Sequence, residues 1–292
     1  MVTDLQANIR AVRHAALVAR DVESVTVVIG EVVDDLLARS EAYRTRVRGL
    51  GVALSGDVDR SVGVVRYTPF LGWRDVPFAQ LVTSRTGLPT VLDNDVRALS
   101  AAEGWFGAGN GARSFVLVTV GSGIGCGIVV NGAVISGAHG VTGEIGHLTI
   151  DQQGPVCRCG NRGCLEAIAS DPAIIDQINQ LPGVHVRTPG EAAALAHSGH
   201  EGASAVYARA GRAIGLGLAA AVNLIGPERV IISGEGLAAY DLFEQQIRTT
   251  FAQHAFSTAD QCEIVVCPLS FDEWARGAAT VAIKAFISQE KD

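Results

Sequence analysis

The chain alternates between short apolar runs and longer stretches in which apolar residues recur every three or four positions. The short runs predict strands at residues 50–54, 88–93, 114–120, 128–130, 148–151, 230–233 and 263–267. The helical spacing predicts helices at residues 31–48, 96–105 and 273–288, and a mostly helical stretch from Glu166 onward. Residues 25–29 fit either a short strand or the first turn of a helix. Strands that alternate with helices indicate an α/β fold.

Composition narrows the class of protein. Hydrophobic residues make up 48% of the 292 positions and charged residues 18%, which is enough apolar material for one or two packed cores. The net charge is −7 and the basic residues are scattered, which argues against a nucleic-acid-binding surface. Residues 1–20 lack the apolar run of a signal peptide, and no stretch has the about 18 apolar residues of a membrane span. We therefore expect a cytoplasmic protein that does not enter a membrane.

One histidine and three of the six cysteines are spaced as metal ligands. His147, Cys157, Cys159 and Cys164 form the pattern H-x9-C-x-C-x4-C. One imidazole and three thiolates make a closed tetrahedral zinc site of the structural type, which leaves no position for a catalytic water. The alternative is three incidental buried or redox-active cysteines.

A glycine-rich segment follows the apolar run that ends at Val120. Glycines stand at positions 121, 123, 125 and 127. Backbone N–H groups in such a segment can approach and cradle a phosphate. The spacing is neither that of a Rossmann fold nor that of a P-loop, and a tight β-hairpin explains it equally well.

Three polar residues, Asp93, Asn94 and Asp95, end another apolar run. A carboxylate at a strand end can act as a general base toward a hydroxyl group, and Asn94 can hydrogen-bond the same polyol. The alternative is that these residues cap the helix that begins near Val96.

Two glutamates flank the cysteine cluster. A metal loop would bring Glu166 back toward Glu144, and two carboxylates facing one cleft with Asn94 would suit a sugar. The alternative for either glutamate is a solvated surface charge.

Together these residues resemble the ROK family of repressors, open reading frames and kinases that act on sugars. Residues 144–147 followed by residues 157–166 match the family motif, and the resemblance extends over about residues 1–285. It implies an actin-like ATPase fold of two ribonuclease-H-like lobes, a sugar cleft between them, and structural zinc on the four clustered ligands. The sugar contacts that it implies are Asn94, Asp95, Glu144, His147 and Glu166. In the family's kinases, the residue at Asp95 is the catalytic base.

The resemblance also implies where the lobes and a nucleotide would lie. We expect a smaller N-terminal lobe of residues 1–110 plus 275–292 and a larger C-terminal lobe of residues 111–274. The segment at residues 107–112, Gly-Ala-Gly-Asn-Gly-Ala, is the expected boundary. If the chain is a kinase, the resemblance implies that ATP and Mg²⁺ are bound with the help of Gly121, Ser122, Gly123, Gly234 and Gly236.

The sequence departs from the family's kinases at three places. The first strand and its Asp-x-Gly-x-Thr phosphate loop are missing, which removes much of the charge clamp that phosphoryl transfer needs. Ser55 stands where the kinases usually have proline, and Phe70 where they have asparagine. The segment at residues 233–236, Ser-Gly-Glu-Gly, resembles the glycine turn near the adenosine in the family's kinases and is called the adenosine turn here. Glu235 lies between its two glycines, where its charge could repel a phosphate.

These departures favour one function over another. Residues 93–107 resemble the family's regulators, so we expect the sugar-binding effector domain of a transcriptional regulator, N-terminally shortened and without the helix-turn-helix that contacts DNA. Its expected partners are a sugar or sugar phosphate and a second copy of the chain, in a dimer or a higher oligomer. The alternative is an ATP-dependent hexose or N-acetylhexosamine kinase with Asp95 as its base. A scaffold held only by its zinc loop is the third possibility.

Overall fold

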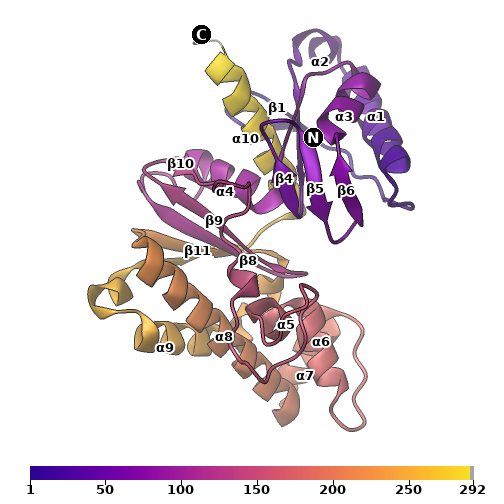
Figure 1. The fold of residues 1–292 in the computed structure, drawn as a ribbon. Helices are drawn as coiled ribbons and strands as arrows, with labels where there is room; N and C mark the ends of the chain where they lie inside the picture. The colour runs from indigo at the N-terminus through magenta and orange to yellow at the C-terminus, as the bar shows by residue number, and fades with distance from the viewer. Residues whose placement is uncertain (290–292) are drawn as a thin grey trace. The chain divides into compact units, whose positions relative to one another are not determined.

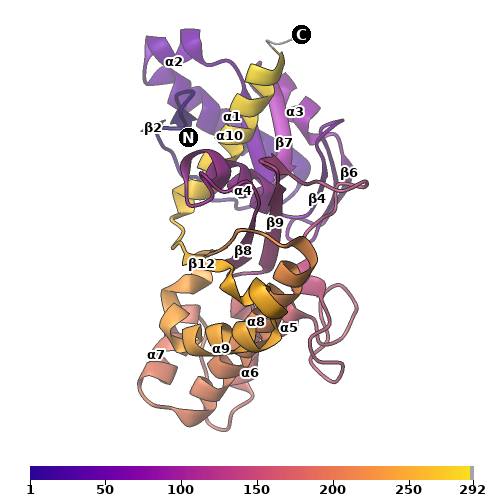
Figure 2. The same ribbon diagram turned by 90° about the vertical axis from the view of Figure 1, so that its left-hand side faces the viewer.

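The computed structural model describes residues 1–289 and divides the chain into two compact units (Figures 1 and 2). Unit 1 contains residues 1–110, the short segment Ser136–Thr142 and the C-terminal residues from Ser270. Unit 2 contains Gly111–Ile135 and Gly143–Leu269. Each unit has its own hydrophobic core.

Unit 1 is built from short strands and five helices. Its strands are β1 (Val2–Thr3), β2 (Ile9–Ala11), β3 (Leu50–Leu54), β4 (Asp57–Asp59), β5 (Val64–Thr68), β6 (Trp73–Val76) and β7 (Thr90–Asn94). Its helices are α1 (Val22–Ala38), α2 (Glu41–Arg46), α3 (Phe78–Thr86), α4 (Asp95–Phe106) and α10 (Phe271–Gln289). The strands form three small sheets: β1 with β2, β3 with β7, and β4 with β5 and β6. The pairing of β3 with β7 is parallel, and α10 packs on β3 and α4 (Figure 2).

The core of unit 1 is small. Val58, Val65, Phe78, Val82 and Leu92 are almost completely buried and belong to one cluster. They come from β4, β5, α3 and β7, so this core joins the parallel and antiparallel strands.

One expectation for the N-terminal residues needs correction. Residues 25–29 lie in the long helix α1, which is the second of the two alternatives that their sequence allowed. The helix expected at residues 31–48, however, is divided in two. The break falls at Ser40, whose extended backbone cannot continue a helix and whose Oγ accepts a hydrogen bond from the Ala42 N–H at 3.2 Å. Tyr43 continues the apolar spacing across this break, which is why the pattern alone predicts a single helix.

Unit 2 contains a mixed five-stranded sheet in the order β10-β9-β8-β11-β12. The strands are β8 (Phe115–Val120), β9 (Ile124–Val130), β10 (Ala133–Val134), β11 (Arg229–Ser233) and β12 (Glu263–Val266). β8, β11 and β12 run parallel, and β9 and β10 are added in antiparallel fashion. All six residues of β8 are buried, as its unbroken apolar sequence and its place in the middle of the sheet require.

Helices account for most of the remaining residues of unit 2. They are α5 (Leu165–Ala169), α6 (Asp171–Asn179), α7 (Pro189–His197), α8 (Glu201–Ile225), α9 (Glu244–His254) and the 3₁₀ segments η1 (Ile145–His147), η2 (Glu235–Leu242) and η3 (Ser257–Gln261). Within residues 1–289, α8 alone is long and apolar enough to cross a membrane. A core helix meets the same criteria. Because 56% of its apolar window is buried and it packs against α5 and α9, α8 is a core helix here (Figure 1).

The strand expected at residues 148–151 is absent. Only an isolated bridge between Thr149 and Cys164 forms there. The N–H groups of Ile150 and Asp151 both point to the Gly163 carbonyl, at 2.8 and 3.2 Å, so this backbone closes the cysteine loop instead of joining a sheet.

Candidate functional site

The histidine and three cysteines of the proposed metal site lie together in unit 2. One ligand atom from each of His147, Cys157, Cys159 and Cys164 lies within 4.8 Å of the others. Cys157 Sγ is 3.6 Å from His147 Nδ1, and the sulfur atoms of Cys159 and Cys164 are 3.7 Å apart. A tetrahedral zinc ion about 2.3 Å from sulfur and about 2.0 Å from nitrogen separates such atoms by roughly 3.6–3.8 Å. The four residues therefore fit a four-coordinate zinc ion whose ligands all come from the protein.

The loop that carries these ligands is held by its own backbone. The Cys157 N–H donates to the Asn161 carbonyl and the Gly163 N–H to the Pro155 carbonyl, each at 2.7 Å. Gly163 has a φ of +70°, and a Cβ there would lie 1.5 Å from the Asp151 carbonyl oxygen. Glycine is therefore required where the loop turns back toward α5.

Two of the thiols are in an environment that disfavours their anions. Burial, and then the neighbouring thiols of Cys159 and Cys157, raise the pKa of the Cys164 thiol to about 12. Burial likewise raises the pKa of Cys157. A divalent cation at the centre of the cluster would reverse this preference, because metal coordination deprotonates the thiols.

The start of β9 organises three of the residues expected to bind sugar. Glu166 Oε2 accepts a hydrogen bond from the Ile124 N–H at 3.1 Å. Gly143 and Gly146 pack so closely on the same strand that a Cβ would lie 2.1 Å and 2.3 Å from its carbonyl oxygens. This contact fixes η1, which Glu144 precedes and His147 ends.

His147 faces two ways. Its Nδ1 points to the cysteine cluster, and its Nε2 lies 3.9 Å from Glu144 Oε2. This distance is too long for a hydrogen bond, so Glu144 lies beside the imidazole without fixing its orientation directly.

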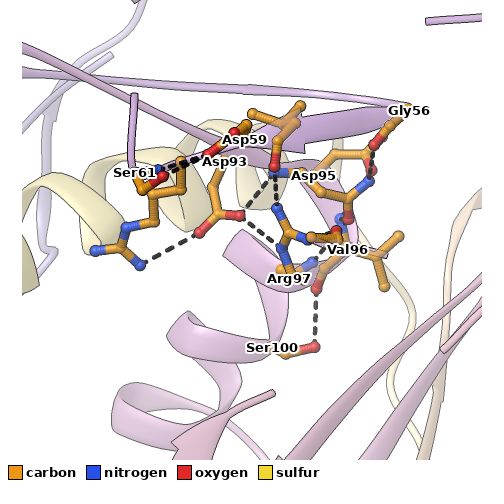
Figure 3. Close-up of polar contacts among 12 residues, drawn as sticks. Gly56, Asp59, Ser61, Asp93, Asp95, Val96, Arg97 and Ser100 are labelled. Atoms are coloured by element: carbon orange, nitrogen blue, oxygen red, sulfur yellow. Dashed lines mark hydrogen bonds and ion pairs between the residues drawn. The ribbon is translucent and has the colours of Figure 1, made fainter. Parts of the chain in front are cut away.

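Asn94 and Asp95 lie in unit 1, where β7 ends and α4 begins. Asn94 is the N-cap of α4: its Oδ1 accepts from the N–H groups of Val96 and Arg97 at 3.0 and 3.1 Å. Its Nδ2 donates to the Gly56 carbonyl at 3.1 Å (Figure 3). Asp95 occupies the first turn of α4 and is partly exposed. The capping bonds fix the orientation of the Asn94 side chain. Because one hydrogen of its amide group bonds Gly56, the other is left for a ligand.

Beneath this cap lies a buried ion pair that the sequence analysis did not identify. Asp93 Oδ1 accepts from Arg97 Nε at 2.7 Å, and both side chains are only 7% exposed. Arg97 also donates to the carbonyls of Val58, at 2.9 Å, and Gly140 (Figure 3). Asp93 near the end of β7 and Arg97 in the first turn of α4 are four residues apart, and this spacing of opposite charges was the available signal.

The glycine-rich segment forms the hairpin between β8 and β9. Gly121, Ser122 and Gly123 make its turn, and the Gly121 N–H donates to the Gly123 carbonyl at 3.1 Å. Gly234 and Gly236, at the end of β11, pack against Val120, which precedes this turn. The two segments expected to hold a nucleotide are therefore neighbours.

A carboxylate from one of these segments occupies the other. Glu235 Oε1 accepts from the Ser122 N–H at 3.3 Å and from its hydroxyl at 3.1 Å. A Cβ added to Gly121 would lie only 2.5 Å from the Glu235 carboxyl carbon, so the carboxylate packs directly against this glycine. Glu235 thus takes up donors that the turn would offer to a phosphate.

A second acidic residue, Asp171, borders the same turn; unlike Glu235, it was not identified from the sequence. Its N–H donates to the Gly121 carbonyl at 2.8 Å. Burial, and then the charge of Glu235, raise the pKa of Asp171 to about 6. The surroundings of the turn are therefore acidic, which suits a phosphate poorly.

The chain belongs to the ROK family, because the family model described by that name matches residues 1–285. A putative xylose repressor from Caldicellulosiruptor sp. strain Rt8B.4 is 33% identical over 239 residues, covering 78% of this chain and 60% of the repressor. The chain thus spans about three fifths of the length of that relative.

Solved structures of both functional types are similar to this chain. A ROK family transcriptional regulator, a homologue of the Escherichia coli MLC protein, superposes with a TM-score of 0.85 at 27% identity, covering 97% of this chain and 74% of the regulator. A ROK family glucokinase from Streptomyces griseus, in complex with glucose and AMPPNP, gives 0.81 at 25% identity, covering 96% and 93%. The chain therefore has the actin-like α/β fold of ROK proteins.

Proposed function

We propose that this chain is the sugar-binding effector domain of a ROK-type transcriptional regulator and does not phosphorylate its ligand. The observation that carries the proposal is the hydrogen-bonded contact of Glu235 with Ser122 in the hairpin turn. A phosphate at that turn would have to displace the carboxylate and then remain beside it. Two unit charges 4 Å apart repel by about 4 kcal/mol at an effective dielectric constant of about 20, and a polyphosphate carries several charges.

The ligand in this proposal is a sugar or a sugar phosphate. The residues proposed to contact it are those that the family resemblance implies: Asn94, Asp95, Glu144, His147 and Glu166. Asn94 is held at the N-terminus of α4, His147 by the cysteine cluster and Glu166 by the first residue of β9. Glu144 directly precedes η1, and Asp95 lies in the first turn of α4. Such preorganised amide and carboxylate groups hydrogen-bond hydroxyls without much loss of side-chain entropy.

Zinc has a structural role in this proposal. Bound by His147 and the three cysteines, it would neutralise the thiolates and leave no open position for a reaction. Its effect on the sugar would be to hold the loop between His147 and Glu166 in place. We also propose a cytoplasmic location and a homodimer or higher oligomer, without DNA contact by these 292 residues.

Kinase activity is the second candidate. It is favoured by Asp95 at the start of α4, in the position of the family's catalytic base, and by the 93% coverage of the Streptomyces griseus glucokinase. In that reaction Asp95 would take the proton of the attacking sugar hydroxyl while ATP and Mg²⁺ supplied the phosphoryl group.

Nucleotide binding separates the two candidates. ATP with Mg²⁺ is titrated by calorimetry into the zinc-loaded protein and into Glu235→Gln, which removes one charge and keeps the side-chain size. Glu263→Gln, a matched change at an exposed position of β12, is the control. We expect no measurable binding by the wild type and the control. Glu235→Gln should bind measurably, with an affinity at least about tenfold above the detection limit that the wild type fails to reach. Tight binding by the wild type that Glu235→Gln leaves unchanged would refute the proposal.

A further inference from the structure

The sequence contains two Asn-Gly pairs, and both lie in exposed turns. Asn110-Gly111 ends the turn after α4, where the chain passes from unit 1 to unit 2. Asn131-Gly132 forms the two-residue turn between β9 and β10. An asparagine before a glycine readily loses ammonia from its side chain, because glycine has no Cβ to shield the backbone nitrogen that attacks the asparagine. The two pairs share this chemistry and their exposure, but the surrounding structure holds them differently.

The turn at Asn131 is fixed by hydrogen bonds on both of its residues. The Gly132 N–H donates to the Arg113 carbonyl at 2.7 Å, and the Asn131 N–H donates to Ser114 Oγ at 3.2 Å. The side-chain oxygen of Asn131 accepts a hydrogen bond from the Arg113 guanidinium at 3.1 Å. The backbone nitrogen that would attack and the side-chain amide that it would attack are therefore both engaged. Loss of ammonia at this pair requires the turn to open first.

The turn at Asn110 is fixed only as far as the asparagine's own N–H. The Gly109 N–H donates to the Glu103 carbonyl and the Asn110 N–H to the Gly107 carbonyl, each at 3.1 Å. Among residues 1–289, none forms a hydrogen bond with the Gly111 N–H or with the Asn110 side chain. Gly111 has a φ of +87°, and no heavy atom lies within 4 Å of the place that a Cβ would occupy. The attacking nitrogen is therefore free, and the space around it is open.

We propose that Asn110 is a site of spontaneous covalent modification, which converts it to aspartate and isoaspartate through a cyclic imide. The Gly111 nitrogen gives up its proton and bonds to Cγ of Asn110. The side-chain amide nitrogen takes up a proton and leaves as ammonia, which closes a succinimide ring. Water then adds to one of the two ring carbonyls and opens the ring. Opening at one carbonyl gives aspartate, and opening at the other gives isoaspartate, whose main chain runs through the former side-chain carboxyl group.

Both products change the covalent link between the two units. Each adds one negative charge to a chain whose net charge is already −7. Isoaspartate also lengthens the backbone by one methylene group. Because unit 1 contains Asn110 and unit 2 begins at Gly111, this change falls on the peptide bond that joins them. The inference is independent of the function proposed above, since no sugar or nucleotide contact enters it.

Peptide mass spectrometry of the full chain tests the proposal, with the second Asn-Gly pair as an internal control. Trypsin cleaves after Arg97, Arg113 and Arg158, so residues 98–113 and 114–158 form separate peptides with a single asparagine in each. The protein is incubated folded and, in parallel, unfolded in urea. Mildly alkaline buffer is used because it promotes loss of the proton from the attacking backbone nitrogen. Isoaspartate in each peptide is quantified with protein L-isoaspartate methyltransferase and labelled S-adenosylmethionine.

In the folded protein, we expect peptide 98–113 to lose ammonia at least about tenfold faster than peptide 114–158, and to contain isoaspartate. Tenfold in rate converts to about 1.4 kcal/mol, which is comparable to the net contribution of one intramolecular hydrogen bond. In urea the two rates should become similar, because the hydrogen bonds at Asn131 are then lost. Equal rates in the folded protein, or an unmodified peptide 98–113, would overturn the proposal. So would a product that contains aspartate without isoaspartate, or a tenfold difference that persists in urea.

Discussion

Replacing Arg97 by methionine should destabilise unit 1 strongly. The side chain is 7% exposed and donates to Asp93 at 2.7 Å and to the Val58 carbonyl at 2.9 Å. Methionine fills much of the same volume but donates nothing. The substitution therefore leaves the Asp93 carboxylate buried, with Arg60 at 3.3 Å as its remaining cationic partner. It also leaves the carbonyls that Arg97 had satisfied without that donor.

The expected loss of unfolding free energy follows from the partners that Asp93 keeps when Arg97 is replaced. Removing one member of a buried ion pair costs about 3–5 kcal/mol, since the other charge stays buried. Arg60 is 44% exposed and keeps part of the attraction, so we expect the lower end, about 3 kcal/mol. With a urea dependence of about 2 kcal/mol per molar, the unfolding midpoint should fall by roughly 1.5 M. All three tryptophans, Trp73, Trp105 and Trp274, lie in unit 1, so their fluorescence in urea reports on the unfolding of that unit.

A double-mutant cycle separates the ion pair from packing. Asp93→Asn with Arg97→Met should cost at least about 2 kcal/mol less than the two single substitutions added together, because no charge is then left buried. Arg66→Met, which breaks exposed ion pairs in the same unit, is the control and should shift the midpoint little. A midpoint for Arg97→Met within about 0.3 M of the wild type, or strict additivity in the cycle, would refute the reasoning.

Three further predictions concern unit 2. Cys159→Ser should lower zinc from about one ion per chain to near zero by elemental analysis and reduce the melting temperature, whereas Cys262→Ser, outside the cluster, should leave the metal content unchanged. Asp171 has its pKa raised to about 6, so the folded state binds this proton more tightly than the unfolded state and loses stability as pH rises from about 4 to about 6. Asp171→Asn should remove that loss, and its advantage over the wild type should appear in calorimetry at pH 7.5 and be absent at pH 4. The raised pKa corresponds to about 3 kcal/mol, which solvent screening of this partly exposed group reduces to about 1 kcal/mol. Glu144→Gln should weaken sugar binding at least about tenfold without releasing zinc, because Glu144 is not among the four ligands; equal affinity would remove it from the site.

Local patterns predicted much of this molecule. The strands at residues 50–54 and 230–233 were predicted from apolar runs, and the clustering of His147 with three cysteines from a pattern that spans only residues 147–164. The residues that form each of these features are close together in the sequence, so the local pattern alone determines that they come together. The helix break at Ser40 was missed because a capping serine does not interrupt the apolar spacing around it.

Contacts between distant segments could not be predicted in the same way. Glu235 and Ser122 are 113 residues apart, and they meet because β8 and β11 pair in parallel and end at the same edge of the sheet. The sequence predicted that the charge of Glu235 lies in the adenosine turn. It did not predict that the Glu235 carboxylate accepts hydrogen bonds from Ser122 in the β8–β9 hairpin. Similarly, the half-burial of β3 is a property of its neighbours in space, which its own residues do not reveal.

We propose that this ROK protein binds a sugar without phosphorylating it. The most direct test measures ADP release with ATP, Mg²⁺ and a panel of hexoses and N-acetylhexosamines, on protein shown to be folded and zinc-loaded. We predict no sugar-dependent release above background. Sugar-dependent turnover that Asp95→Asn abolishes would contradict the claim and identify the chain as a kinase with Asp95 as its base.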